Sequence, residues 1–233
     1  MYPVAASDAR VFIGAYALGA PDDLGAWREG LAALDVDGVE HPLAPPDAAD
    51  EPDPWFAEDW DVLVTCIPVV MTRLAADPRY GLASTDDDGR AAAVHDVRRA
   101  LALGRRLADA SGRRRVVGVE VHSSPGPRLG SPDALSRSLT DLLVEDRTGA
   151  ELVVEHCDRF LAGQAAAKGF FPLEDEIAAV RAVVGDDVCG GIGIGLNWGR
   201  SAIEGRSAAL PVSHAHAAAA SGLLRSAVLS GAS

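Results

Sequence analysis

Lysine, cysteine and aromatic residues are scarce in this chain of 233 residues, and long apolar runs are missing. Lys168 is the single lysine, and 21 basic residues stand against 34 acidic ones, which gives a formal net charge of −13. Because such a charge repels phosphate groups, we expect no nucleic acid partner and no binding to an anionic membrane. No apolar segment approaches the roughly 20 residues that a membrane-spanning helix needs.

The three cysteines, Cys66, Cys157 and Cys189, lie far apart, each in or beside an apolar segment. They form no CxxC pair, so reduced and buried thiols are the simplest interpretation. The N-terminal residues have neither the basic nor the apolar region of a secretion signal. We therefore expect a cytoplasmic protein, and the length suits one domain over residues 1–233.

Short apolar segments alternate with segments of helical periodicity along the chain. Strands are expected at 11–19, 36–41, 61–68, 116–122, 151–158, 190–197 and 223–231. Helices are expected at 22–35, 86–110, 133–144, 173–184 and 211–221, with a short one at 55–60. This alternation predicts an α/β fold with parallel strands and helices outside.

Repeats of this length favour a (β/α)8 TIM-barrel-like fold in which seven strands are visible. The eighth βα unit is then missing, and the domain is C-terminally incomplete; an open doubly wound parallel sheet is the alternative. In a barrel, the polar residues that end the strands share one face. Those residues are Tyr16, Glu40, Cys66, His122, Glu155, Asn197 and Ser230.

The stretch from Gly190 to Arg206, GGIGIGLNWGRSAIEGR, combines an apolar strand with a polar end. Its glycines alternate inside the strand instead of joining a strand to a helix, which argues against a dinucleotide loop. Arg200 and Glu204 follow the strand, and a guanidinium group there would bind a carboxylate or a phosphate. The alternative is a loop held together by its own arginine and glutamate pairs.

Two strand ends carry candidate acid–base groups. Strand alternation places Glu155 on the same side as Cys157 and opposite His156, so Glu155 is a base or ligand, or the ion-pair partner of Arg200. His122 shares a side with Glu120, which predicts a histidine oriented by the carboxylate beneath it. A purely structural histidine bonded to a carboxylate is the alternative.

Three further regions bear on function. Lys168, in the loop after the fifth strand, is either a cation that meets the ligand or an exposed lysine. Residues 69–89 form an unusually long connection, expected to close over a polar ligand. The polar residues of that connection are Arg73, Arg79 and Tyr80. His214 and His216 are two apart in a helix, which argues against a joint metal site.

Several of these motifs carry a resemblance to a known superfamily. GVE at 38–40, VEVHSSP at 119–125, VVEHCD at 153–158 and GLNWGRS at 195–201 resemble the xylose isomerase-like TIM barrel superfamily. The segments TRLAADPRYGLAS at 72–84 and LLRSAVLSGAS at 223–233 are similar to a branch of that superfamily that is a domain of unknown function. The superfamily includes sugar isomerases and epimerases, so the resemblance implies carbohydrate metabolism.

The resemblance implies an isomerase or epimerase that acts on a small polar metabolite, a sugar or a sugar acid. Glu155 and His122 would be its catalytic residues. The substrate-binding residues would be Glu40, Asn197, Arg200, Glu204 and Lys168. The alternative from a different class is a barrel without catalysis that binds a polar metabolite or a protein partner.

The resemblance also raises the question of a divalent metal, Mn, Mg or Zn. Metal-dependent members bind it through a Glu ending strand five, an Asp ending strand six, a His near strand seven and a Glu ending strand eight. Glu155 matches the first position, whereas Asn197 and Arg200 occupy the places of the strand-six Asp and its following His. With Asn197 as a second ligand at best, the set is poor in the charged oxygens that hard cations prefer.

Overall fold

The computed structural model describes residues 9–14, 16, 24–45, 48, 59–185 and 191–231, and its centre is one sheet of seven parallel strands. The strands are β1 (Phe12–Ile13), β2 (Gly38–Pro42), β3 (Asp61–Thr65), β4 (Val116–Val121), β5 (Glu151–His156), β6 (Ile192–Asn197) and β7 (Leu224–Val228). Each strand pairs with the next one along the chain, so the sheet order is β1-β2-β3-β4-β5-β6-β7.

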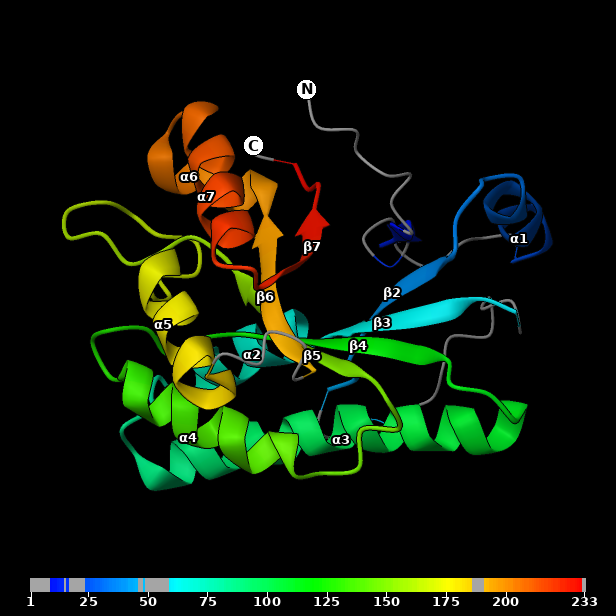
Figure 1. Cartoon of the computed structure of the whole chain (residues 1–233), viewed down its shortest axis with the longest axis horizontal. Helices are drawn as coiled ribbons and strands as arrows, with labels where there is room; N and C mark the ends of the chain where they lie inside the picture. The colour runs from blue at the N-terminus through cyan, green and yellow to red at the C-terminus, as the bar shows by residue number, and fades with distance from the viewer. Residues whose placement is uncertain are drawn as a thin grey trace.

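This order distinguishes the two predicted architectures. A doubly wound sheet turns back on itself at a switch point, whereas here the order rises without reversal. The sheet is also curled, since β6 and β7 stand steeply to β2, β3 and β4 (Figure 1). The TIM-barrel-like prediction is therefore confirmed, and the doubly wound alternative is wrong. That the eighth βα unit is missing stays a prediction.

Helices cover the outside of the curled sheet. They are α1 (Leu24–Ala32), α2 (Ile67–Ala76), α3 (Asp87–Ser111), α4 (Pro132–Leu143), α5 (Leu173–Val184), α6 (Trp198–Gly205) and α7 (Ala209–Ala220). Contacts run from α3 to α4, from α4 to α5, and from α5 to α7, so these helices form a continuous outer layer. Figure 1 shows α3 and α4 side by side beneath the strands.

Side chains alternate between the helix layer and the inside of the sheet, and β6 shows this most clearly. Ile192 and Ile194 are fully buried in the main apolar cluster. The intervening glycines face the inside, where space is short: a Cβ on Gly195 would lie 2.6 Å from the Ser226 Oγ and 2.8 Å from a Val153 methyl. The glycines therefore relieve crowding inside the barrel, as the sequence predicts.

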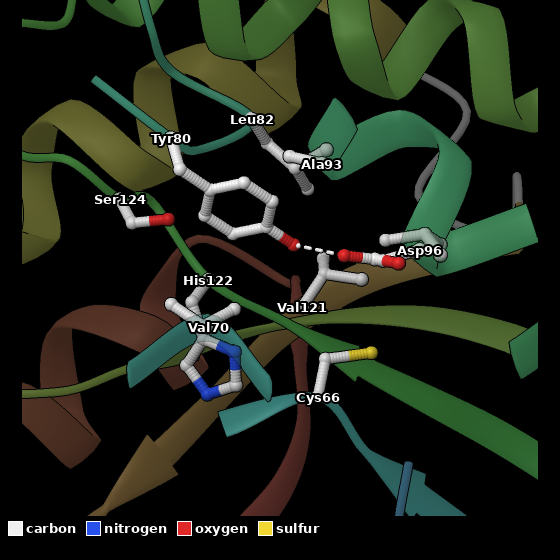
Figure 2. Close-up of a pocket in the computed structure, with 10 residues that line it drawn as sticks. Cys66, Val70, Tyr80, Leu82, Ala93, Asp96, Val121, His122 and Ser124 are labelled. Atoms are coloured by element: carbon white, nitrogen blue, oxygen red, sulfur yellow. Dashed lines mark hydrogen bonds between the residues drawn. The ribbon is translucent and has the colours of Figure 1, made fainter. Parts of the chain in front are cut away.

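The long connection at 69–89 differs from the expected loop. Most of its first part is helix α2, and Pro68 lies in the first turn of that helix, where a proline is well tolerated. Tyr80 is buried, and its hydroxyl donates to the Asp96 carboxylate at 3.0 Å (Figure 2). Arg73 pairs with the same carboxylate, and Arg79 pairs with Asp77 and Asp86. The prediction of a closing loop is wrong for these residues, because they are tied to the outer helices.

Other expectations differ at their ends or lie outside the described residues. Residues 198–205 are helix α6 where a loop was expected. The described part of the expected strand 11–19 is regular at Phe12–Ile13 alone. Most of the expected helix at 55–60, the acidic start at 22–23, and Cys189 lie outside the described residues. Cys66 and Cys157 are buried and are not joined in a disulfide. None of the helices in the described ranges has the length and hydropathy to cross a membrane.

Candidate active site

The carboxyl ends of the strands bring six polar side chains into the curled sheet, which we call the mouth cluster: Tyr16, Glu40, Glu120, His122, Glu155 and Asn197. Glu40 comes from β2, Glu120 from β4, Glu155 from β5 and Asn197 from β6. Tyr16 and His122 follow β1 and β4. All of them except Glu120 were predicted to gather at the strand ends, because parallel strands end on one face.

Glu155 is the centre of the mouth cluster. Its Oε2 lies 2.7 Å from the Nε2 of His122, and its Oε1 accepts a hydrogen bond from the Asn197 amide nitrogen at 2.8 Å. Burial alone would raise the pKa of Glu155, but the bond and charge of His122 and the bond from Asn197 outweigh it and lower the pKa. Glu155 is therefore an ionised carboxylate in a nearly dry position, since it is 4% exposed.

The partner of His122 is thus not the residue that the strand pattern predicts. Both carboxylate oxygens of Glu120 are buried without a hydrogen-bond partner among the described residues. Residues i and i+2 on one strand are roughly 6.6 Å apart, whereas neighbours on adjacent strands are about 4.8 Å apart. Glu155, one strand over, therefore reaches the imidazole better than Glu120 does. Arg200 was the other predicted partner of Glu155, and it is not the group that bonds this carboxylate.

The environment favours the protonated form of the other two carboxyl groups. Burial, then the charges of Glu155 and Glu40, raise the pKa of Glu120 well above its ordinary value. Burial, then the charge of Glu155, raise the pKa of Glu40 to about 7, although the hydroxyl of Tyr16 donates to its Oε1 at 3.1 Å. Environments that push neighbouring pKa values apart are typical of acid–base sites. One ionised carboxylate thus lies beside two carboxyl groups whose pKa values are raised.

Lys168 supplies positive charge from the loop after β5. Its charge contributes to lowering the pKa of Glu155. The Asp158 carboxylate holds this loop, because its Oδ2 accepts the backbone N–H groups of Ala167 and Lys168 at 2.6 and 2.9 Å. Phe170, at the end of the same loop, packs at a tilted angle against the ring of His122, with 6.0 Å between ring centroids. The loop therefore covers His122 and carries a cation to the edge of the mouth.

Behind His122 lies a small cavity of about 10 Å³. His122, Cys66, Tyr80 and Ser124 are among the residues that surround it (Figure 2). The Nδ1 of His122 and the Oγ of Ser124 have no hydrogen-bond partner among the described residues, and a cavity of this size holds about one water. The Nε2 side of the His122 ring is thus anchored by Glu155, while its other side borders this cavity.

Asn197, a second metal ligand at best in the prediction, uses its amide group in hydrogen bonds. Its Oδ1 already accepts the Ser230 hydroxyl at 2.7 Å and the Arg200 backbone N–H at 3.1 Å, and its amide nitrogen donates to Glu155. These bonds make Asn197 the N-cap of α6 and fix its amide orientation. The mouth therefore does not fit the oxygen-rich Mg or Mn site of the metal-dependent enzymes. Cys157 and His122 lie near Glu155 with potential ligand atoms within 4.8 Å, a set of mixed S, N and O donors.

Glu204 lies elsewhere. It belongs to a second group on the helix side of β5, which we call the outer cluster: His156 of β5, Glu176 of α5, Glu204 of α6 and His214 of α7. The Nδ1 of His156 lies 2.7 Å from Glu176 Oε2, and Ser123 donates to the other oxygen of Glu176. Arg200 remains at the start of α6, through the bond of its backbone to Asn197. Of the predicted site residues, the structure brings Glu40, His122, Glu155 and Asn197 together with Lys168 nearby, and it separates Glu204 from them.

The fold belongs to the TIM-barrel-like α/β class. A crystal structure of a D-tagatose 3-epimerase-like protein has the same fold, with a TM-score of 0.53, 15% identity, and coverage of 84% of this chain and 67% of that one. The apo form of the 3-keto-D-glucoside 4-epimerase YcjR from E. coli matches with a TM-score of 0.48 and 14% identity over 94% of this chain and 77% of that one.

By sequence, the chain belongs to the family of the domain of unknown function DUF4862, which matches residues 12–233. An uncharacterized protein of Salmonella typhimurium strain LT2 is 32% identical over 222 residues, covering 88% of this chain. The chain spans 65% of the length of that curated relative.

Proposed function

We propose that the protein is an isomerase or epimerase of a small sugar or sugar acid, working by proton transfer next to a carbonyl group. The observation that carries the proposal is the pairing of Glu155 with His122 and Asn197 beside two carboxyl groups whose pKa values are raised. Such reactions need a base and an acid that face the substrate together. The likeness of the fold to a D-tagatose 3-epimerase-like protein supports the same class of reaction.

In this mechanism Glu155 is the base. A carboxylate oxygen has two lone pairs, so each Glu155 oxygen keeps one beyond its bond to His122 or Asn197. It removes the proton from the carbon next to the carbonyl, and the electron pair of that C–H bond forms the C=C bond of an enediolate. In an isomerisation the Glu155 carboxyl then returns the proton to the neighbouring carbon. In an epimerisation a second carboxyl group of the mouth cluster delivers a proton to the opposite face of the same carbon, because return by Glu155 would restore the starting configuration.

The negative charge of the enediolate oxygen needs donors in a nearly dry site. Lys168 provides a cation, and the Glu40 carboxyl provides an O–H that it donates as the charge develops. With a pKa of about 7, Glu40 exchanges its proton readily near neutral pH, which suits a general acid. His122 is the positioning residue, because it holds the Glu155 carboxylate in its ionised form.

Proton exchange with solvent tests this proposal. The protein is incubated in D₂O with a panel of aldoses, ketoses and uronic acids, and NMR follows deuterium at the carbon next to the carbonyl. We expect exchange with at least one member, reduced about 10²–10⁴-fold by Glu155→Gln and by His122→Asn. Glu174→Gln is the matched control, since Glu174 is 71% exposed on α5, and it leaves the rate unchanged.

Three results contradict the proposal. Exchange that is lost with EDTA and restored by Mn²⁺ or Mg²⁺ overturns the metal-free mechanism. Binding of a sugar in calorimetry without exchange, and with affinity lost in Glu155→Gln, overturns the enzyme assignment and supports a binding protein. A sugar bound equally by wild type and Glu155→Gln shows that the mouth is not the site.

A further inference from the structure

The outer cluster has the composition of a transition-metal site and lies apart from the mouth. Three potential ligand atoms, one each from His156, Glu204 and His214, lie within 4.8 Å of one another. They come from β5, α6 and α7, so three separate elements converge on one point. His156 is 0% exposed and the side chain of Glu204 is 3% exposed, while the side chain of His214 is 12% exposed and forms the outer edge.

Both histidines point their free nitrogen at the same carboxylate. The Nε2 of His156 lies 3.5 Å from Glu204 Oε2, and the Nε2 of His214 lies 3.8 Å from Glu204 Oε1. The Nε2 of His156 is buried without a hydrogen-bond partner among the described residues. Ligands of a tetrahedral Zn²⁺ at about 2.0–2.1 Å from the metal are about 3.3 Å apart. The observed separations, to the two oxygens of one carboxylate, are somewhat longer than this, so the three side chains would move closer together around a bound ion.

The second nitrogen of each histidine is already held by an acceptor. The Nδ1 of His156 lies 2.7 Å from Glu176, and the Nδ1 of His214 lies 3.0 Å from the Ser201 hydroxyl. Metal-binding histidines almost always have their second nitrogen held in this way, which fixes the tautomer and aims the first nitrogen at the ion. An ordinary buried ion pair needs one oriented histidine, whereas here two are oriented toward one point.

The two carboxylates of the outer cluster offset the charge of a divalent ion. Glu204 and the buried Glu176 are two acidic groups, and two neutral imidazoles add no charge. Arg159 also approaches Glu204, with its Nε 3.0 Å from Oε1 and its backbone N–H bonded to Oε2 at 2.9 Å. Each carboxylate oxygen keeps a further lone pair beyond these contacts. The guanidinium, 36% exposed, can remain on the solvent side of a metal-bound Glu204.

We infer that His156, Glu204 and His214 bind one Zn²⁺ ion, with Glu176 and Ser201 as the partners that orient the two histidines. Two imidazoles and one carboxylate are a ligand set typical of zinc, and an open fourth position would be filled by water on the side of His214. The site joins α6 and α7 to the end of β5. It is separate from the proposed reaction and does not depend on it.

Zinc binding to the whole protein tests the inference, with the metal alone as the probe. The protein is stripped with a chelator, and Zn²⁺ is titrated against a competing chromophoric chelator. We expect one ion per chain, and its affinity to fall at least about 100-fold in His214→Asn. We expect the zinc affinity to fall about 10–100-fold in Glu176→Gln, because this replacement changes a residue that orients His156 and leaves the three proposed ligands in place.

Two control variants and a folding measurement distinguish an ion in the outer cluster from one in the mouth and from a loss of structure. His216→Asn changes an exposed histidine two residues away on the same helix and leaves zinc affinity unchanged. Glu155→Gln, in the mouth cluster, also leaves it unchanged. Circular dichroism shows whether each variant is folded. If His214→Asn does not fold, Co²⁺ is bound to the wild type instead. The visible absorption of the Co²⁺ form then shows whether the ion has a tetrahedral site with nitrogen ligands.

The outcomes are distinct. One ion per chain lost in His214→Asn and kept in Glu155→Gln supports the outer site. No stoichiometric zinc in the wild type overturns it, and so does binding that is equal in His214→Asn and the wild type. Binding lost in Glu155→Gln alone places the ion in the mouth, which also overturns the inference.

Discussion

Replacement of Glu40 by glutamine isolates the electrostatics of the mouth cluster. The carboxyl of Glu40 has an ordinary pKa of 4.5 and a pKa of about 7 in the folded protein, because of burial and the charge of Glu155. At low pH the group is protonated in both states and the pKa difference has no effect on stability. Between the two values the unfolded chain releases the proton and the folded protein holds it, so the free energy of unfolding falls as pH rises.

The size of this effect follows from the two pKa values. At about 1.4 kcal/mol for each tenfold change in the proton equilibrium, the loss reaches about 3 kcal/mol at about pH 8. The side chain of Glu40→Gln does not titrate, so the free energy of unfolding of this variant lacks this part of the pH dependence. Relative to the wild type, the variant therefore gains about 2–3 kcal/mol between pH 5 and pH 8.

Urea unfolding at both pH values measures the difference, with Glu174→Gln as the exposed control. The control and the wild type should change by the same amount between the two conditions. If the difference between Glu40→Gln and the wild type is the same at pH 5 and pH 8, Glu40 is an ordinary carboxylate. The acid role assigned to it in the mechanism then fails as well.

Three other replacements have measurable effects that the observed contacts define. Asn197→Asp replaces the amide donor to Glu155 with a second carboxylate, so we expect a loss of roughly 1–3 kcal/mol in urea unfolding and a new affinity for Mn²⁺ in calorimetry. Asp158→Ala leaves the backbone N–H groups at 167–168 without their acceptor; limited proteolysis should then cut this loop faster than in the wild type. Ile194→Ala empties a fully buried position on β6 and should cost about 2–5 kcal/mol in the same unfolding assay; a cost below about 1 kcal/mol contradicts close packing at this position.

Much of the fold is predictable from the sequence, since apolar strands and amphipathic helices alternate along it. Helices α2 and α6 were not predicted, because the residue types at their N-termini also occur in other structural roles. Pro68 was interpreted as the end of a strand, although proline is also favoured in the first turn of a helix. Asn197 was interpreted as a site residue, although asparagine before a helix is an N-cap, and it is one here.

The mouth residues were predictable as a group, but their pairing was not. Which carboxylate meets His122 depends on the register of β4 against β5, and no pattern within one strand contains that information. The outer cluster was missed for the same reason. His214 was compared with its helix neighbour His216, whereas its partners are His156 of β5 and Glu204 of α6.

Glu155 and His156 are consecutive residues, so one peptide plane separates the two clusters. Because strand side chains alternate, a slip of β5 by one residue would exchange them, with the imidazole inside the barrel and the carboxylate under the helices. The alternation of glycine with bulky residues in β6 opposes this slip, since Gly195 pairs with Glu155 and a Cβ at Gly195 would lie 2.8 Å from a Val153 methyl. The glycines of β6, which take no part in the proposed reaction, thus help to fix which side chains of β5 face the inside of the barrel and which face the helices.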